Sequence, residues 1–209
     1  MPDDVNPRWL DWAREIQALA QTGQAFTKSH YERLSFSRLS DIAAEILAEH
    51  SELEANEVKR AFSLEPGYAT PKVDVRAAVI REGRILMVRE TADGKWAMPG
   101  GWADVGDRPS ETAERETLEE SGFHVRATKL IGAFDANRGR KASMFFHAVK
   151  LIFLCEFLGG TATKSMETLD VDFFDLDSLP PLSEQRTNQR HLEEVRAHLR
   201  DPLRMAAFD

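Results

Sequence analysis

The first third of the chain repeats apolar residues at the three-to-four-residue spacing of amphipathic helices. Asn6 and Pro7 suit an N-cap and a first helical turn, and the pattern then continues to Gly23. A second helical pattern covers residues 31–47, and "SELE" at 51–54 has the form of a capping box that opens a third, shorter helix. The start of the chain therefore predicts an all-helical segment.

The pattern changes to strands after "SLEPGYATP" at 63–71, whose glycine and prolines are typical of a linker. Apolar and β-branched residues dominate 72–80 and 84–90, and Glu82 with Gly83 lies between these two runs. Two strands separated by a short glycine-containing turn predict a β-hairpin.

Helical and strand patterns alternate in the remainder of the chain. This order predicts an α+β fold with a small all-helical domain over residues 1–66 and a larger domain over 67–209. The expected elements are a helix over about 109–121, strands over about 124–134 and 144–157, a short strand at 171–176, and a last helix capped by Ser183.

The net charge, the cysteine content and the length of the apolar runs exclude several classes of protein. The formal net charge of -8 makes a general attraction to nucleic acid or to an anionic membrane unfavourable. Cys155 is the one cysteine, so no intrachain disulfide can form. The first residues lack the apolar core of a signal peptide, and the longest apolar run, 151–155, is too short to span a bilayer. We expect a cytoplasmic protein with neither nucleic acid nor membrane as a partner.

Three glutamates share one side of the expected helix at 109–121. At helical geometry, Glu119 and Glu120 lie about 60° and 40° to either side of Glu116. Like charges at these spacings each cost a helix about 0.2–0.5 kcal/mol, which Arg115 can offset in part. One interpretation is a solvated helix face. The other is a hard-oxygen site for Mg²⁺ or Mn²⁺, because a divalent cation relieves the repulsion.

The stretch "GGWADVGDRPSETAERETLEESGF" at 100–123 resembles the Nudix box, G-x5-E-x7-R-E-U-x-E-E-x-G-U, where U is a bulky apolar residue. Asp107 departs from this pattern by replacing a glutamate with a shorter carboxylate, and Thr117 departs from it at an apolar position. The matching positions are Gly101, the Arg115–Glu116 pair, the Glu119–Glu120 pair, and Gly122 with Phe123.

The resemblance implies an α/β/α sandwich on a mixed sheet over about 72–180. The helical segment before it is similar to a subgroup with an N-terminal helical domain, which includes bacterial CDP-choline and ADP-ribose pyrophosphatases. That subgroup is dimeric, so we expect residues 1–62 to form a homodimer. Packing of these helices within one chain is the alternative.

The resemblance also implies a reaction. We expect metal-dependent hydrolysis of the pyrophosphate bond in a nucleoside diphosphate linked to another moiety, such as ADP-ribose or CDP-choline, with two monophosphate products. By the resemblance, Mg²⁺ or Mn²⁺ is held by Glu116, Glu119 and Glu120 with the Gly101 carbonyl. The expected catalytic residues are Arg115, Glu119, Glu120 and, as the base that orients water, Glu167.

Candidate substrate contacts are less specific. Arg76 and Arg89 alternate within expected strands and could meet phosphates, although ion pairs explain them equally well. Trp102 follows the glycine loop and could stack on a base, or pack the loop. Asp135 follows an expected strand and could accept from a ribose, or form a turn. The sequence leaves open the substrate, the phosphorus attacked and the number of metal ions.

A non-catalytic, nucleotide-sensing regulator is the rival function, because some Nudix folds are fused to DNA-binding domains. Residues 1–50 hold five Lys and Arg against eight Asp and Glu, and a DNA-reading helix needs a basic face. An isopentenyl-diphosphate isomerase, which shares the fold, would need a reactive cysteine. Cys155 lies in an apolar strand pattern that predicts packing.

Overall fold

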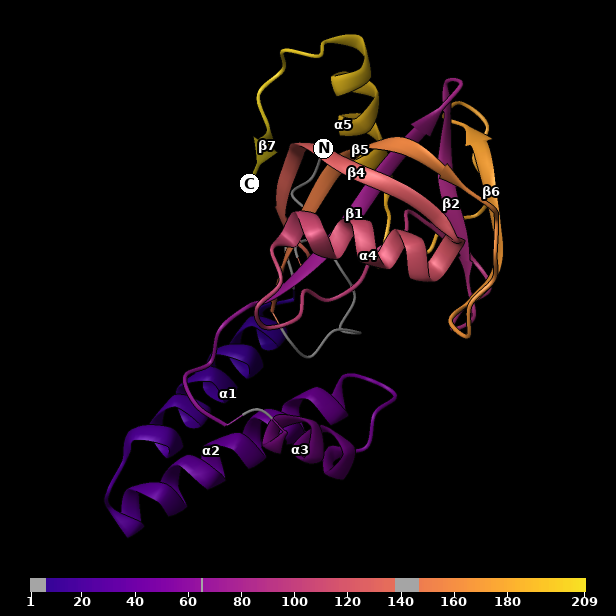
Figure 1. Ribbon diagram of the computed structural model, residues 1–209. Helices are drawn as coiled ribbons and strands as arrows, with labels where there is room; N and C mark the ends of the chain where they lie inside the picture. Colours follow the sequence, from indigo (N-terminus) through magenta and orange to yellow (C-terminus); the bar gives the residue numbers. More distant parts are fainter. Residues whose placement is uncertain (1–6, 65, 138–146) are drawn as a thin grey trace. The chain divides into compact units, whose positions relative to one another are not determined.

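The computed structural model describes residues 7–64, 66–137 and 147–209 (Figure 1). It divides into a helical unit, which extends to Pro71 and also includes Asn137 and His147, and a sheet unit of Lys72–Ala136 and Ala148–Asp209. Within the described residues, no helix is both long and apolar enough to cross a membrane.

The helical unit consists of α1 (Arg8–Phe26), α2 (His30–Glu49) and α3 (Ala55–Ser63). Ser29 caps α2, because its side chain accepts a hydrogen bond from the Glu32 N–H. The three helices enclose a small core of their own, made by Leu10, Ala13, Ala43, Ala44, Leu47, Val58 and Phe62.

This core leaves a line of large apolar side chains uncovered on α1. Trp12, Leu19 and Phe26 are exposed, and each is two helical turns from the next, so they share one face. On α2, Tyr31 and Leu34 are exposed as well. We call these five residues the apolar stripe.

The capping box predicted at 51–54 is wrong. Helix α3 begins at Ala55 with Glu54 at its N-cap, and Ser51 lies outside it. The Ser51 hydroxyl donates instead to the Leu47 carbonyl at 2.7 Å, so it satisfies an acceptor at the end of α2. The predicted N-cap Asn6 lies outside the described residues.

The sheet unit has the strand order β3-β2-β1-β5-β4-β7, with β6 paired to β2. Strand β1 runs parallel to β5, and β4 parallel to β7, while the other pairs are antiparallel. The sheet is therefore mixed, as predicted. Its elements are β1 (Lys72–Arg81), β2 (Arg84–Glu90), β3 (Trp96–Ala97), α4 (Pro109–Ser121), β4 (Phe123–Asp135), β5 (Ala148–Gly160), β6 (Thr168–Asp175), α5 (Gln189–Arg200) and β7 (Ala207–Phe208).

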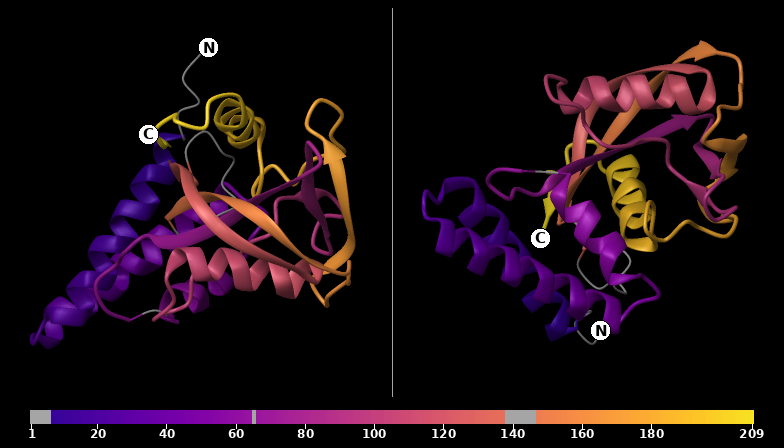
Figure 2. Two further views of the ribbon diagram at one scale, coloured as in Figure 1. Left: turned by 45° about the horizontal axis from the view of Figure 1, so that its top comes forward. Right: turned by 90° about the horizontal axis from the view of Figure 1, so that it is seen from below.

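One helix covers each face of the sheet, which makes the predicted α/β/α sandwich (Figure 2). On one face, Ala113 of α4 packs with Val75 and Val79 of β1. On the other, Leu192 and Val195 of α5 pack with residues of β1, β2, β4 and β5. Because successive side chains of a strand point to opposite faces, β1 and β2 contribute to both cores.

The predicted hairpin is confirmed. Arg81 pairs with Arg84, and the two residues between them have positive φ angles, 52° for Glu82 and 77° for Gly83. A two-residue loop with positive φ at both positions matches the right-handed twist of the flanking strands. Strand β5 is central, as its apolar sequence predicted, and its expected first residues, 144–146, lie outside the described residues.

The predicted cap of the last helix is wrong. Helix α5 begins at Gln189, and Asn188 caps it: its Oδ1 accepts from the His191 N–H at 3.1 Å, and its own N–H donates to His191 Nδ1 at 3.2 Å. The Ser183 hydroxyl instead donates to Asp93 Oδ2 at 2.8 Å. A cap is defined by this contact geometry, which the sequence alone does not reveal.

We expect Asn188→Ala to destabilise the protein by about 1 kcal/mol, because it leaves the His191 N–H without its acceptor. Urea denaturation measures this change, with Asn188→Asp as the control that keeps the acceptor. An unchanged midpoint in Asn188→Ala would contradict the assignment of the cap.

Candidate active site

The site begins with the glycine loop that follows β3. The Pro99 and Gly101 carbonyls accept from the N–H groups of Ala77 and Val75 at 2.9 and 2.8 Å, so the loop pairs along β1. Gly100 has φ 143°, and a Cβ there would lie 2.0 Å from the Val75 carbonyl oxygen. Only glycine allows this approach of loop and strand.

Helix α4 presents its glutamates to this loop. Glu120 is 6% exposed, and its Oε2 accepts from the Gly100 N–H at 2.9 Å. Burial raises the pKa of Glu120 to about 8, against the lowering effect of Arg76. Burial also raises the pKa of Glu116, against the effect of Arg115. The carboxylate of Glu119 is more exposed to solvent.

Arg115 is the counter-ion of Glu116 and Glu119, but not of Glu120. Its guanidinium lies 2.7 Å from a Glu116 oxygen and 3.3 Å from a Glu119 oxygen. It also lies 3.4 Å from Asp104 and 3.4 Å from Asp107, the residue that replaces the glutamate of the box. One arginine thus partly neutralises four carboxylates.

These segments enclose a pocket of about 450 Å³. It brings together six predicted residues, Trp102 among them, and it adds Asp104, Ser165 and Met166, which were not predicted from the sequence. The lining residues are Gly101, Trp102, Asp104, Glu116, Glu119, Glu120, Ser165, Met166 and Glu167. Loop residues such as Ser165 carry no pattern that reveals their position beside α4.

The donor set suits a divalent cation. The lining supplies carboxylate oxygens, which divalent cations prefer as ligands. Burial raises the pKa values of two of these side chains, Glu116 and Glu120. Within residues 7–64, 66–137 and 147–209, no three His, Cys, Asp or Glu side chains are already placed to hold a metal ion. Arg115 and the Gly100 N–H partly satisfy the glutamates in this arrangement, and a cation would neutralise the remaining negative charge.

Three predicted substrate contacts are not among the lining residues. The Arg76 side chain is buried, and it donates to Asp74 Oδ1 at 3.0 Å and to the Met98 carbonyl at 3.3 Å. Arg89 donates to the Gly94 carbonyl at 2.8 Å. Asp135 is the last residue of β4. Their contact with substrate stays a prediction.

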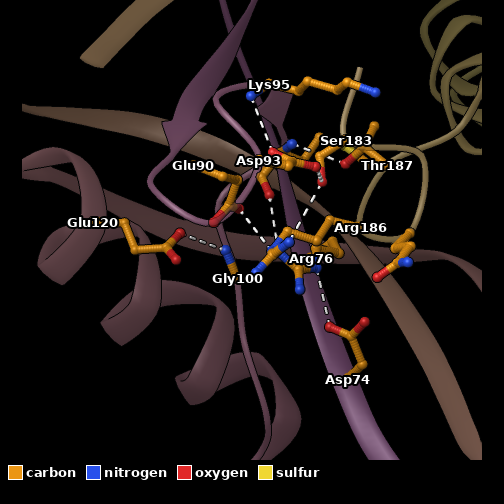
Figure 3. A network of polar contacts seen from close by, with 12 residues as sticks. Asp74, Arg76, Glu90, Asp93, Lys95, Gly100, Glu120, Ser183, Arg186 and Thr187 are labelled. Atoms are coloured by element: carbon orange, nitrogen blue, oxygen red, sulfur yellow. Dashed lines mark hydrogen bonds and ion pairs between the residues drawn. The ribbon is translucent and has the colours of Figure 1, made fainter. Parts of the chain in front are cut away.

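A buried charge network lies behind the glycine loop (Figure 3). The fully buried Lys150 places its Nζ 3.1 Å from Asp74 Oδ2 and donates to the Gln185 and Arg186 carbonyls at 3.0 and 2.6 Å. The Met98 N–H donates to the Thr187 hydroxyl at 2.9 Å. The segment around Thr187 is therefore hydrogen-bonded to the residue that precedes the glycine loop.

Glu90 and Arg186 extend this network. Arg186 Nε lies 3.0 Å from Glu90 Oε1, and burial raises the pKa of Glu90 against the lowering effects of Arg186 and Arg76. Four residues of this network were not predicted from the sequence: Asp74, Glu90, Lys150 and Arg186. The available signal was a charged residue inside an otherwise apolar strand, as for Asp74 and Lys150.

An α/β/α sandwich whose glycine loop packs on a glutamate-bearing helix defines a protein of the Nudix type. The family described as "NUDIX domain" matches residues 70–195, and the one described as "UDP-X-like, N-terminal oligomerisation domain" matches residues 7–62. The chain belongs to the Nudix hydrolase family, and the predicted family and N-terminal helical subgroup are confirmed.

Similar proteins support this placement. YjhB of Bacillus subtilis strain 168, which carries a provisional assignment as an ADP-ribose pyrophosphatase, is 36% identical over 98% of this chain and 99% of its own. The solved structure of a UDP-X diphosphatase is 31% identical, with a TM-score of 0.61, over 97% of this chain and 98% of that chain. An ADP-ribose pyrophosphatase from Streptococcus suis 89-1591 is 35% identical, with a TM-score of 0.60, over 67% of this chain and 100% of that chain.

We expect Glu120→Gln to stabilise the metal-free protein at alkaline pH. The folded state raises the pKa of Glu120 from 4.5 to about 8, so folding takes up a proton between these values. The protonated Glu120 carboxyl therefore contributes fully to the free energy of unfolding below pH 4.5, and this contribution is lost as the pH rises through about 8.

Urea denaturation in the presence of a chelator, repeated across this pH range, measures the free energy of unfolding of each variant. The stability of the wild-type protein should fall relative to that of Glu120→Gln as the pH rises. Glu119→Gln removes a more exposed charge from the same helix and is the matched control, which should follow the wild type. Parallel pH profiles for wild type and Glu120→Gln would contradict the burial of a costly charge.

Proposed function

We propose that the protein hydrolyses the pyrophosphate bond of a nucleoside diphosphate linked to a second moiety, giving two monophosphates. The pocket that joins the three box glutamates to Glu167 carries this proposal. Two of the similar proteins are named for ADP-ribose and one for UDP-X, and these names support a nucleoside diphosphate derivative as the substrate. CDP-choline remains a candidate within that class.

The reaction depends on Mg²⁺ or Mn²⁺, held by Glu116, Glu119 and Glu120 with the Gly101 carbonyl. One lone pair of that carbonyl already accepts from the Val75 N–H, and the other is available. When bound, the cation neutralises the phosphates and stabilises the charge that develops as water attacks phosphorus. The pocket lining holds five carboxylates and neither Lys nor Arg, so a diphosphate without a cation would be repelled.

The chain's own residues then have separate roles. Glu167 accepts a proton from the attacking water and orients it. Arg115 holds Glu116 and Glu119 in place from one side. Trp102, which is 45% exposed on the pocket, offers a face on which a base can stack.

We also propose that residues 1–66 form an oligomerisation domain and 67–209 the hydrolase domain, in a cytoplasmic homodimer. The match of residues 7–62 to an N-terminal oligomerisation domain supports this assignment. The apolar stripe supports it too, because an exposed patch of large side chains usually marks an interface, and twofold pairing is the commonest arrangement. The alternative of a nucleotide-sensing regulator gains no support.

A panel assay with Mg²⁺ or Mn²⁺ tests the reaction on ADP-ribose, CDP-choline, UDP-glucose, ADP-glucose, NADH and diadenosine polyphosphates. We expect two monophosphates from at least one compound, loss of turnover with EDTA, and recovery when the cation is restored. Glu120→Gln is the control against a contaminating hydrolase, and its kcat should fall by several orders of magnitude, since it lacks one anionic ligand. Full turnover in a chelated sample would overturn the metal dependence.

Light scattering tests the dimer. We expect the full chain to have the mass of a dimer at micromolar concentration, and Leu19→Glu to have the mass of a monomer, because it places a charge in the apolar stripe. Leu203→Glu, the same change at an exposed leucine of the sheet unit, should stay dimeric. A chain shortened to begin at Gly67 should be monomeric. A monomeric full-length protein would rule the dimer out.

A further inference from the structure

The segment between β5 and β6, residues 161–167, closes the C-terminal end of α4 together with Thr168, the first residue of β6. The last carbonyls of a helix have no partner within it and need one from elsewhere. Here the Leu118 carbonyl accepts from the Gly122 N–H at 2.8 Å, and the Ser121 carbonyl accepts from the Thr163 N–H at 2.9 Å. The Glu120 carbonyl accepts from the Thr168 hydroxyl at 2.9 Å.

The Thr168 hydroxyl has every hydrogen-bonding position filled. Its one hydrogen goes to the Glu120 carbonyl, and it accepts from the Ser165 N–H at 3.0 Å. The Ser165 hydroxyl lies 3.1 Å away and must be the donor of that bond, because Thr168 has no second hydrogen to give. Thr168 is 2% exposed, so water cannot replace these partners.

The same contacts fix the backbone of Glu167. The Ser165 hydroxyl accepts from the Glu167 N–H at 3.1 Å, and the Glu167 carbonyl accepts from the Thr91 N–H at 3.0 Å. The chain of bonds from the Glu120 carbonyl through Thr168 and Ser165 to the Glu167 N–H is therefore continuous. Its two ends are residues that line one pocket.

We propose that Thr168 is a positioning residue, whose hydroxyl holds Glu167 at a fixed place relative to the glutamates of α4. The inference rests on the proposed function, because it assigns Glu167 the contact with the attacking water. Thr168 itself lies outside the pocket lining and acts through Ser165 and Glu167. A small displacement of a group that orients water lowers the rate of the reaction strongly. Loss of the Thr168 hydroxyl is therefore expected to lower kcat.

Three variants of the full chain test the proposal with the panel compound that the wild-type protein hydrolyses fastest. Thr168→Val keeps the shape but lacks the hydroxyl, and we expect a kcat roughly 10- to 100-fold lower with KM nearly unchanged. Thr168→Ser keeps the hydroxyl and should restore turnover. Thr163→Val is the matched control and should match the wild type, because the exposed Thr163 hydroxyl donates to the Thr161 carbonyl of the same segment and, among the described residues, to no residue that lines the pocket.

A double-mutant cycle separates positioning from general destabilisation, with all assays run well below the melting temperature of each variant. In the Glu167→Gln background, Thr168→Val should lower kcat by less than about two-fold, because the group it positions is already inactive. If Thr168→Val lowers kcat by the same factor in the Glu167→Gln background as in the wild type, the two residues act independently and the proposal is overturned. Normal turnover in Thr168→Val would overturn it as well. If the wild-type protein hydrolyses no panel compound, the proposed function fails; if it is active and Glu167→Gln retains full turnover, only the role given to Glu167 and Thr168 fails.

Discussion

The hydrogen bond from the Gly100 N–H to the Glu120 carboxylate joins the two segments on which the pocket depends. Backbone hydrogen bonds hold the glycine loop against β1, and the hydrogen bond to Glu120 holds helix α4 against the loop. Any side chain at Gly100 would separate the loop from β1 and carry Gly101 away from Glu116. The placement of the acidic residues therefore follows from a close backbone approach, and their charges alone would drive them apart.

Charged side chains lie on both sides of that contact, and those behind the loop are buried, which is costly unless partners are close. Behind the loop, Asp74 is shared by Arg76 and Lys150, so each buried cation has a carboxylate beside it. In front of it, Arg115 alone faces four carboxylates, which leaves the pocket with excess negative charge. Charges are thus paired in the buried network behind the glycine loop. In the pocket, negative charge remains in excess, and this is where the proposed cation and diphosphate would bind.

Much of the fold was accessible from the sequence, because hydrophobic periodicity and glycine turns are local signals. The hairpin at Glu82–Gly83, the central strand β5 and helix α4 followed from such signals, and the box motif identified the family. The two caps at Ser51 and Ser183 failed because each hydroxyl bonds a partner outside the expected helix. Lys150 and Thr168 were missed because their partners are distant in sequence, and only the folded sheet brings them together.

The parallel pairing of β1 with β5 has a consequence for how the chain folds. Lys72 meets Ala148 across this ladder, so the centre of the sheet cannot form until most of the chain has been synthesised. The contacts among α1, α2 and α3 are local in sequence by comparison, and domains near the N-terminus fold first during synthesis. The apolar stripe is therefore exposed on the ribosome before the sheet has formed, so its uncovered side chains can associate with another chain, or aggregate, before the pocket exists.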